Sequence, residues 1–422
     1  MSQYTQSVQR ELHSGSHSAT ANYTAVASGA ILIANPGYHK SIFLTDLNIS
    51  NGDTAGYFRI FEGGSAVNTV IIERQNLAID RLSDLNFAQA IHLTPHNNLL
   101  IYSDTADDFS VTVNYYIDEV KGFGYSSGGD TGSYTNVIGE NFFASDSNST
   151  DLADLTVARA LGAGQSSAVS GYTCGGYLYS ASNVIDKFSF SSDGDATDVG
   201  NLTVARGALA GQSSSTHGYS AGGIDYPSGS PIIEYATIDK FSFTSDGNAT
   251  SVGDLSGKRI LLCGQWSASH GYTSGGGDER NDRETAIDKF SFASDGDATA
   301  VANLTTAVSK MAGNSSPTHG YTSGGQTDSF RQWAQIEKFS FASDGDATAV
   351  GELTLARLYL AGTSSLTDAF VAGGFIDNYA PVADVYGVNT IDKFSFASDD
   401  KSVDSGDLVT ASFMYSAAGQ QS

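Results

Sequence analysis

The chain has 422 residues, of which 40% are hydrophobic and 47 are glycine, and its formal net charge is −25. This composition is typical of a turn-rich globular protein and excludes a disordered chain. The shortage of Lys and Arg argues against nucleic-acid binding, which depends on clusters of these residues. The negative charge also disfavours anionic membranes.

Residues 1–20 are polar and rich in Ser, Gln and His, which predicts a flexible arm. They lack the basic and apolar regions of a signal peptide. No apolar run in the chain reaches the length of a membrane span. We therefore expect a protein that is made in the cytoplasm and does not insert into a membrane.

Residues 21–120 read as a series of strands, among them SIFLTDLNISN, GYFRIFEGG, NTVIIERQ and FSVTVNYYIDE. Gly, Asn, Asp and Pro separate these pieces at short intervals, a pattern typical of a β-sandwich. The segment IDEVKGF follows, so the predicted domain boundary lies near residue 120.

Residues 121–422 contain a repeat of about fifty residues, the length of a four-stranded propeller blade. Each copy holds a GYxxGG strand and an IDKFSF-like strand, in which Phe188 and Phe190 share one face. An SSDGDAT turn and short apolar segments complete the unit. The IDKFSF-like strands begin at Ile138, Ile185, Ile238, Ile287, Ile336 and Ile391. With no sustained helical period, the sequence predicts an all-β chain with six blades.

The ends of the repeat region predict how the propeller closes. The final AAGQQS matches the AGQSS at 210–214, and the GYxxGG strand that should follow it occurs instead at 122–129. Ring closure removes the exposed edges of an open array. We therefore expect residues 122–129 and the carboxyl terminus to share one blade.

The double glycine, the aromatic strand after it and the Arg that closes LTVAR resemble the kelch repeat of β-propellers. The resemblance covers residues 122–422. The units depart from it by lacking the usual Trp, and two of them lack the Arg, with Val308 or a Thr-Ala-Ser stretch in its place. The resemblance implies the fold.

The segment SIFLTDLNISNGDTAGYFRIFEGG and the later VTVNYY resemble small β-sandwich modules of structural proteins from tailed bacteriophages, particularly phages of marine cyanobacteria. The IDKFSFASDGDAT repeats resemble those of virion proteins from such phages. The resemblance implies a trimeric protein on the surface of the virion, such as a tail fibre or a capsid decoration.

Several repeated polar residues invite functional readings. His217, His270 and His319 stand at one position in three units, but blades are too far apart for these to share a metal ion. Paired Asp residues such as Asp193 and Asp195 lie in the SDGDAT turns, which lack the distal Glu of a calcium loop. We therefore expect turn residues, no metal site and no cofactor. Cys174 and Cys263 are expected to be buried free thiols, a disulfide or reactive thiol being the alternative.

Four arginines are predicted to end equivalent strands and could ring one mouth of the propeller, where they would bind an anionic sugar or a carboxylate. The alternative is that each arginine pairs with a neighbouring Asp or caps carbonyl groups. The four are Arg159, Arg206, Arg259 and Arg357.

The connections from the double glycine to the next strand vary from 8 residues (130–137) to 16 residues (375–390). Such insertions map to one face, often the binding face. They carry aromatic and Arg residues of the kind enriched at recognition surfaces; the alternative is that these side chains only pack the loops. The candidates are Tyr177, Tyr179, Tyr226, Tyr235, Arg280, Arg283, Phe330, Arg331, Trp333, Phe375, Tyr379 and Tyr386.

The sequence contains no GxSxG, HExxH or P-loop motif, and a repeated Asp is more readily architectural than catalytic. We therefore expect a non-enzymatic virion protein. Its first domain would dock on other virion proteins and its propeller would bind a host glycan, a receptor or a neighbouring virion protein. The alternatives are a glycan hydrolase that acts on the host envelope and a cytosolic kelch-type adaptor.

Overall fold

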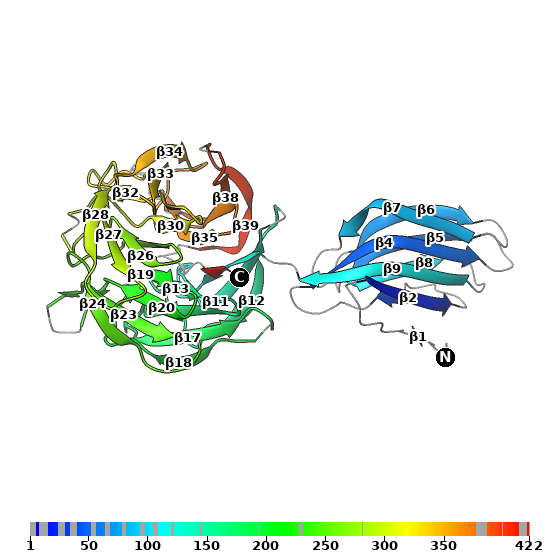
Figure 1. The fold of residues 1–422 in the computed structure, drawn as a ribbon, viewed down its shortest axis with the longest axis horizontal. Coiled ribbons are helices and arrows are strands. Elements are labelled where there is room, and N and C mark those ends of the chain that lie inside the picture. The colour runs from blue at the N-terminus through cyan, green and yellow to red at the C-terminus, as the bar shows by residue number, and fades with distance from the viewer. Residues whose placement is uncertain are drawn as a thin grey trace. The chain divides into compact units, whose positions relative to one another are not determined.

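The computed structural model divides the chain into two compact units, residues 1–121 and 122–422. Side chains are described in residues 122–409, apart from 144–145, 193, 228–230, 281, 377–386 and 399. Elsewhere only the backbone of strands is described. Every described element is a β-strand, so the fold is all-β as predicted (Figure 1).

Residues 1–121 contain two antiparallel sheets, with strand orders β1-β2-β9-β4-β7 and β3-β8-β5-β6. β4 and β9 form the longest pairing, from Lys40 opposite Glu119 to Asn51 opposite Phe109. β2 begins at Ser16, inside the stretch predicted as a flexible arm, because its backbone pairs with β9. The strands are β1 Gln6–Ser7, β2 Ser16–Tyr23, β3 Ala30–Ile33, β4 Lys40–Asn51, β5 Gly56–Gly63, β6 Asn68–Leu77, β7 Leu82–His92, β8 Asn98–Ser103 and β9 Phe109–Glu119.

Residues 122–422 form six antiparallel sheets around a common centre, which confirms the six-bladed β-propeller (Figure 1). We number the blades 1 to 6 in chain order. The AGQSS-like stretch makes the innermost strand, followed outward by the GYxxGG strand, the IDKFSF strand and the strand after the SDGDAT turn. Innermost strands of neighbouring blades touch one another around the centre.

Blade 1 consists of β10 Phe123–Ser127, β11 Val137–Phe142 and β12 Thr150–Asp154, with β40 Gln420–Gln421 paired to β10. Blade 2 is β13 Ala163–Ser166, β14 Ser170–Cys174, β17 Val184–Ser189 and β18 Thr197–Asn201, and blade 3 is β19 Ala210–Ser213, β20 His217–Ala221, β23 Thr237–Ser242 and β24 Thr250–Asp254. Blade 4 is β25 Cys263–Trp266, β26 His270–Ser274, β27 Ala286–Ser291 and β28 Thr299–Asn303, and blade 5 is β30 Ala312–Ser315, β31 His319–Ser323, β33 Gln335–Ser340 and β34 Thr348–Glu352. Blade 6 is β35 Ala361–Ser364, β36 Asp368–Ala372, β38 Tyr386–Ser395 and β39 Val403–Ser412.

Short strand pairs lie in the connections between the second and third strands. They are β15 Tyr177–Leu178 with β16 Ser180–Ala181, and β21 Ile224–Asp225 with β22 Ile233–Glu234. β32 Gln326–Thr327 pairs with β29 Val308–Ser309, and β37 Phe375–Ile376 pairs with β38. β15–β16, β21–β22 and β29–β32 form small sheets of their own, whereas β37 joins the sheet of blade 6.

An aromatic stack joins each blade to the next. The buried ring of Tyr219 lies over Phe292 of the following blade, with centroids 4.8 Å apart and 21° between the planes. It also contacts Phe290, because the two Phe residues of an IDKFSF strand share one face. Equivalent stacks are Tyr125–Phe190, Tyr172–Phe243, Tyr272–Phe341, Tyr321–Phe396 and, between blades 6 and 1, Phe370–Phe143.

Blades 6 and 1 are also linked through their outer strands. The Ser149 N–H donates to the Asp407 carbonyl at 2.7 Å, and the Val409 N–H donates to the Ser149 hydroxyl at 2.9 Å. The Asp407 N–H donates to the Asn148 side chain at 3.0 Å. The first and last blades are therefore neighbours.

Candidate functional site

The two ends of the propeller differ in the variability of their loops. The loops between second and third strands lie at the same end of the propeller as the links between blades. Two antiparallel β-bridges show this, one from Ala160 of a link to Tyr177 of a loop and one from Gly207 of the next link to Ile224 of the next loop. We call this end the loop face. The opposite end, the turn face, carries the SDGDAT turns and the short turns between first and second strands, such as 167–169. The candidate aromatic residues belong to the loop face.

The four arginines predicted as an anion ring are buried, with exposed fractions of 0–3%. Each forms an ion pair, 2.6–3.1 Å long, with the Asp of the third strand in the next blade. Each arginine follows the outermost strand instead of ending it, because β18, for example, stops at Asn201, before Arg206. The pairs are Arg159–Asp186, Arg206–Asp239, Arg259–Asp288 and Arg357–Asp392.

The local structure explains this pairing. A β-bulge between Ile238 and Asp239 directs the Asp side chain out of the regular ladder. Its carboxylate accepts hydrogen bonds from the Thr203 N–H and hydroxyl, as well as from Arg206. Arg206 also donates to the carbonyls of Gly222 and Ser220. The arginines therefore anchor the links between blades, which is the structural alternative that the sequence offered.

Blade 5 departs from the pattern. Val308 stands in place of the arginine, and the buried acid is Glu337 instead of Asp. Thr305 donates its N–H to Glu337 at 3.0 Å and also donates its hydroxyl. Burial raises the pKa of Glu337, while these hydrogen bonds lower it. Glu337, whose side chain is longer than that of Asp, is therefore connected to the link between the blades by hydrogen bonds from Thr305.

The repeated histidines lie on separate blades at the turn face. Nδ1 of each is 2.8–2.9 Å from the hydroxyl of the preceding residue, namely Thr216, Ser269 or Thr318. Burial and a nearby lysine lower the pKa of His217 and His270. These are the hydrogen-bonding contacts of turn residues.

The SDGDAT turns join blades through both of their acidic positions. The first Asp of the turn accepts from a lysine of the preceding blade, as in Lys187–Asp246 and Lys240–Asp295, each 2.9 Å. The second Asp accepts from a backbone N–H of the preceding blade, as Asp195 does from Asp154 at 3.1 Å. Asp193 lies outside the described residues. The described contacts of these carboxylates therefore connect neighbouring blades.

Four tyrosines from the loops of blades 1, 2 and 3 form what we call the tyrosine patch: Tyr134, Tyr177, Tyr179 and Tyr226. Tyr177 and Tyr226 meet edge to face at 5.6 Å, and the Tyr226 N–H donates to the Tyr177 hydroxyl at 2.9 Å. Tyr179 is 89% exposed, has a φ of 58° and meets Tyr134 edge to face at 5.9 Å. Burial raises the pKa of Tyr177 and Tyr226, so both hydroxyls are protonated at neutral pH.

The other aromatic candidates are dispersed. Tyr235 lies over the buried Arg206, whose Cζ is 5.9 Å from the ring centroid. Trp333 is partly buried against the core of blades 4 and 5, and Phe375 is half-buried in β37. Tyr379 and the side chain of Tyr386 lie outside the described residues. Sequence position alone did not separate packing rings from surface rings.

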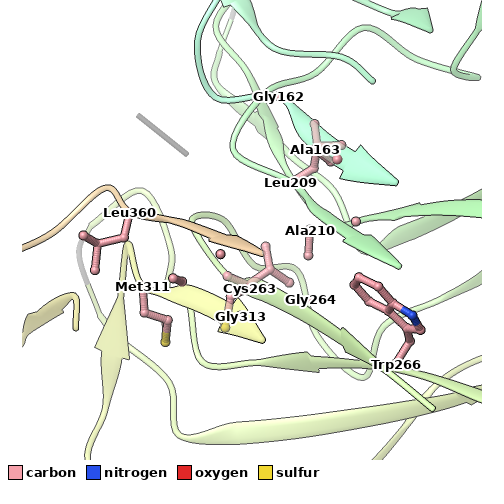
Figure 2. Close-up of a pocket in the computed structure, with 15 residues that line it drawn as sticks. Gly162, Ala163, Leu209, Ala210, Cys263, Gly264, Trp266, Met311, Gly313 and Leu360 are labelled. Atoms are coloured by element: carbon pink, nitrogen blue, oxygen red, sulfur yellow. The ribbon is translucent and has the colours of Figure 1, made fainter. Parts of the chain in front are cut away.

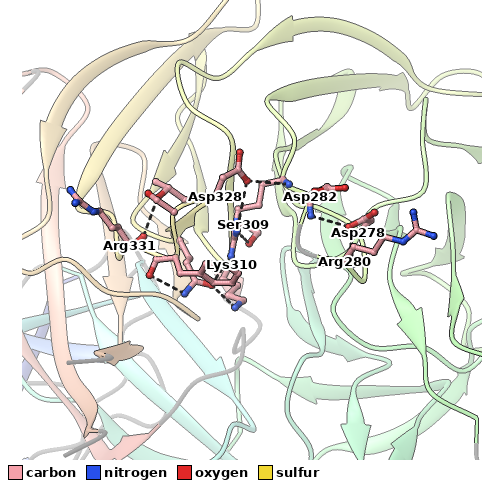
Figure 3. Close-up of polar contacts among 12 residues, drawn as sticks. Asp278, Arg280, Asp282, Ser309, Lys310, Asp328 and Arg331 are labelled. Carbon is pink, nitrogen blue, oxygen red and sulfur yellow. Dashed lines mark hydrogen bonds and ion pairs between the residues drawn. The ribbon is translucent and has the colours of Figure 1, made fainter. Parts of the chain in front are cut away.

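Arg283 and Lys310 belong to what we call the cationic cluster, with Gln326, Phe330 and Tyr359 (Figure 3). Arg283 Nη2 and Lys310 Nζ both donate to Gln326 Oε1, at 2.8 and 2.7 Å. The Arg283 guanidinium lies 5.1 Å from the Phe330 ring centroid, and Lys310 Nζ lies 4.9 Å from that of Tyr359. Burial lowers the pKa of Arg283. Candidates Arg280 and Arg331 are exposed, and their side chains extend away from Lys310 (Figure 3).

The cationic cluster lies beside the central pocket. Five non-glycine residues with φ of 55–64° occupy one position in successive links: Leu161, Ala208, Leu261, Lys310 and Tyr359. Each N–H from Ala208 onward donates to the carbonyl of the preceding member, at 2.8–2.9 Å. The residues directly after them, including Leu209, Met311 and Leu360, line a pocket of about 60 Å³ (Figure 2). We call the partial ring formed by the five residues with positive φ the rim.

The pocket is too narrow for a sugar, because the innermost strands approach closely. A Cβ on Gly211 would lie 2.2 Å from the Gly164 carbonyl oxygen, and one on Gly264 would lie 2.1 Å from that of Gly211. A volume of about 60 Å³ accommodates only small molecules such as water. A larger ligand would therefore bind on the loop face outside the pocket.

Four residues of this region were missed by sequence reasoning: Tyr134, Lys310, Gln326 and Tyr359. A signal for Lys310 existed, since the equivalent positions in three earlier links are Leu161, Ala208 and Leu261. The left-handed backbone at these positions gave no such signal, because none of them is glycine. Comparison of each link against the others would have found the charged outlier.

No protein-family model matches this chain, and no curated protein matches it. In the part of the chain that the structure describes, there is no helix of sufficient length and apolarity to cross a membrane.

Proposed function

We propose that this protein is a structural protein on the surface of a tailed-bacteriophage particle. In this proposal, residues 21–120 form a β-sandwich that docks on other virion proteins, and the propeller presents its loop face to a host glycan or receptor. The protein acts as a homo-oligomer, a trimer, and by binding instead of catalysis. The tyrosine patch is the observation that supports it best.

The tyrosine patch suits recognition for three reasons. Tyr179 exposes 89% of its surface, although aromatic rings gain free energy by burial. Its φ of 58° carries a conformational cost that proteins retain mainly where a side chain must be placed for a purpose. Tyrosine combines an apolar face for the C–H groups of a sugar with a hydroxyl for hydrogen bonding.

The two-domain architecture in the proposal includes ring closure by strand exchange. Gln420 and Gln421 of β40 lie opposite Tyr125 and Gly124 of β10, in the position of an innermost strand. Residues 413–419, which lead to β40, lie outside the described residues. The antiparallel sheets of residues 1–121 support the sandwich. Closure of this kind holds a display domain together because neither end of the array offers an open edge.

Adsorption to host cells tests the display role. We expect full-length Tyr179→Ala and Tyr226→Ala to lose most binding to host cells. Val169→Ala and Leu366→Ala are matched controls, because these side chains are 67% and 83% exposed on the turn face. Equal binding by all four variants and the unchanged protein would reject the loop face as the contact surface.

Particle association tests the virion assignment separately. Mass spectrometry of purified particles should detect the chain, and protein added to particles that lack it should bind through residues 1–121. Sedimentation equilibrium of the full chain should give three times the chain mass of 44.0 kDa. Absence from particles would reject the virion role whatever the propeller binds.

A further inference from the structure

We propose that the cationic cluster binds the negatively charged group of an acidic saccharide, either the carboxylate of a uronic acid or the sulfate of a sulfated sugar. Lys310 makes the contact, and Arg283 supports it from beneath. This inference deepens the proposed function, since it takes the loop face to be the surface that meets a glycan, and it specifies the chemistry of that glycan.

Two positive charges converge at this point. Lys310 Nζ and Arg283 Nη2 share one uncharged acceptor, Gln326 Oε1, so the two cations lie within a few ångströms of each other. Like charges at this range repel, more strongly where water is partly excluded. Asp328 lies 3.7 Å from Arg283 Nη1, but its side chain is 61% exposed, so solvent weakens its effect. A bound anion would reduce the repulsion.

The backbone holds Lys310 in place before any ligand arrives. Its N–H donates to the Leu261 carbonyl, and its own carbonyl accepts from the Tyr359 N–H, each at 2.8 Å. A pre-positioned group binds more tightly because less freedom is lost on binding. The left-handed φ occurs at all five rim residues and belongs to the fold. What distinguishes this position among those five is the positive charge of its side chain.

Aromatic rings next to the charges suit a sugar better than a bare ion. The Tyr359 ring lies beneath Lys310 Nζ, and the Phe330 ring covers Arg283 while remaining 48% exposed. A pyranose could place its acidic group at Lys310 and its apolar face on Phe330. Arg283 has a side chain only 1% exposed, so it acts through the local field and by holding Gln326.

Charge also selects against larger anions. The chain carries −25, so a polyanion such as a nucleic acid would be repelled over most of the surface. A sugar with one acidic group places a single negative charge at the cationic cluster. It brings no further negative charge near the surrounding carboxylates. The ligand class is therefore a saccharide with isolated acidic groups.

The experiment measures binding of defined probes to the full-length protein by calorimetry or ligand-observed NMR at low ionic strength. The probes are glucuronate, galactose 6-sulfate, the neutral sugars glucose and galactose, and inorganic sulfate. We expect an acidic sugar to bind at least tenfold more tightly than its neutral counterpart, and added salt to weaken that binding. Binding of glucuronate alone identifies a uronic acid, and binding of galactose 6-sulfate alone identifies a sulfated sugar.

Variants of Lys310 locate the site. Lys310→Gln should weaken acidic-sugar binding about tenfold, the size of one charge-assisted hydrogen bond, and Lys310→Arg should restore most of it. Lys240→Gln is the matched control, because it removes an equal charge from the turn face, where Lys240 pairs with Asp295. The thermal midpoint of each variant verifies that it is folded.

Three results would overturn the inference: equal binding of acidic and neutral sugars, unchanged binding by Lys310→Gln, or binding of inorganic sulfate without either acidic sugar. Its failure is separable from that of the proposed function. Loss of host adsorption in the tyrosine variants with no acidic-sugar preference rejects only the anion site. Acidic-sugar binding at Lys310 without adsorption to host cells rejects only the display role.

Discussion

Arg206 and Asp239 are both completely buried, and Arg206 Nη1 lies 3.0 Å from Asp239 Oδ2. The pair joins the link before blade 3 to the third strand of that blade, and it repeats at three other links. A buried ion pair is costly to break because the remaining charge stays away from water. The pair therefore holds together two segments that are far apart in the sequence.

Arg206→Ala should lower the free energy of unfolding of the propeller by about 3–5 kcal/mol, because Asp239 would keep its buried charge without the guanidinium. Lys240→Ala, which breaks the partly exposed pair with Asp295, should cost about 0–1 kcal/mol. Urea unfolding followed by tyrosine and tryptophan fluorescence measures both. Similar costs for the two variants would show that burial does not set the value of the pair.

The double variant Arg206→Val with Asp239→Glu reproduces the Val308 and Glu337 combination that blade 5 already contains. We expect it to recover part of the loss in Arg206→Ala, because the longer acid can keep hydrogen bonds to Thr203 as Glu337 does to Thr305. The same urea experiment measures the recovery. A double variant less stable than Arg206→Ala would mean that blade 5 relies on other adjustments.

Glu337→Gln should stabilise the protein at neutral pH. Burial raises the folded-state pKa of Glu337 above the unfolded value of about 4.3, so its contribution to stability is complete below the unfolded value and falls as pH rises through the folded pKa. The neutral amide avoids that loss. Urea midpoints measured from pH 4 to pH 8 should show the two proteins diverging as pH increases, and a constant difference would contradict this origin.

Gly218→Ala should destabilise the propeller by about 1–3 kcal/mol, because the new methyl group would lie 2.3 Å from Cζ of the buried Phe241 ring. Gly257→Ala is the control, since a Cβ there meets nothing within 4 Å. That substitution should be neutral or slightly stabilising, because alanine reduces the freedom of the unfolded chain. Thermal unfolding of both variants measures the difference, and equal midpoints would argue against tight packing of Phe241.

Cys174 and Cys263 should resist modification in the folded protein. Both are buried free thiols, and burial raises the pKa of Cys263 to about 12 and that of Cys174 further. The thiolate, which is the reactive form, is therefore scarce at pH 8. A thiol-reactive dye should label neither residue until the protein is unfolded, when it should label both. Rapid labelling of the native protein would contradict their burial.

Much of the propeller could be predicted from the sequence because the same strand and turn segments recur about every fifty residues. The spacing of the IDKFSF strands predicted six blades, and the alternation of Phe188 and Phe190 predicted a shared face, which meets Tyr125 at 5.5 and 4.7 Å. These features depend on strand geometry, which is local. The predicted share of residues 122–129 in the last blade remains a proposal, supported by the pairing of β10 with β40.

The role of the arginines needed the tertiary structure. In the sequence, Arg206 and Asp239 are 33 residues apart, and nothing local shows that the bulge at Asp239 turns its carboxylate toward the arginine. An arginine at a repeated position could equally face solvent. Burial, which depends on how the link folds over the next blade, decided between an exposed ring and an anchor.

The sequence by itself determined the repeat, the strands and the loops of unequal length, since each follows from residue order and the periodicity of strands. Only the tertiary structure decided which loop side chains share a surface. It brought Arg283 and Lys310 to Gln326 from different links and loops, and it left Trp333 packed against the core. The physical reason is that hydrogen-bond distance and burial are properties of neighbours in space, which residue order specifies only through the completed fold.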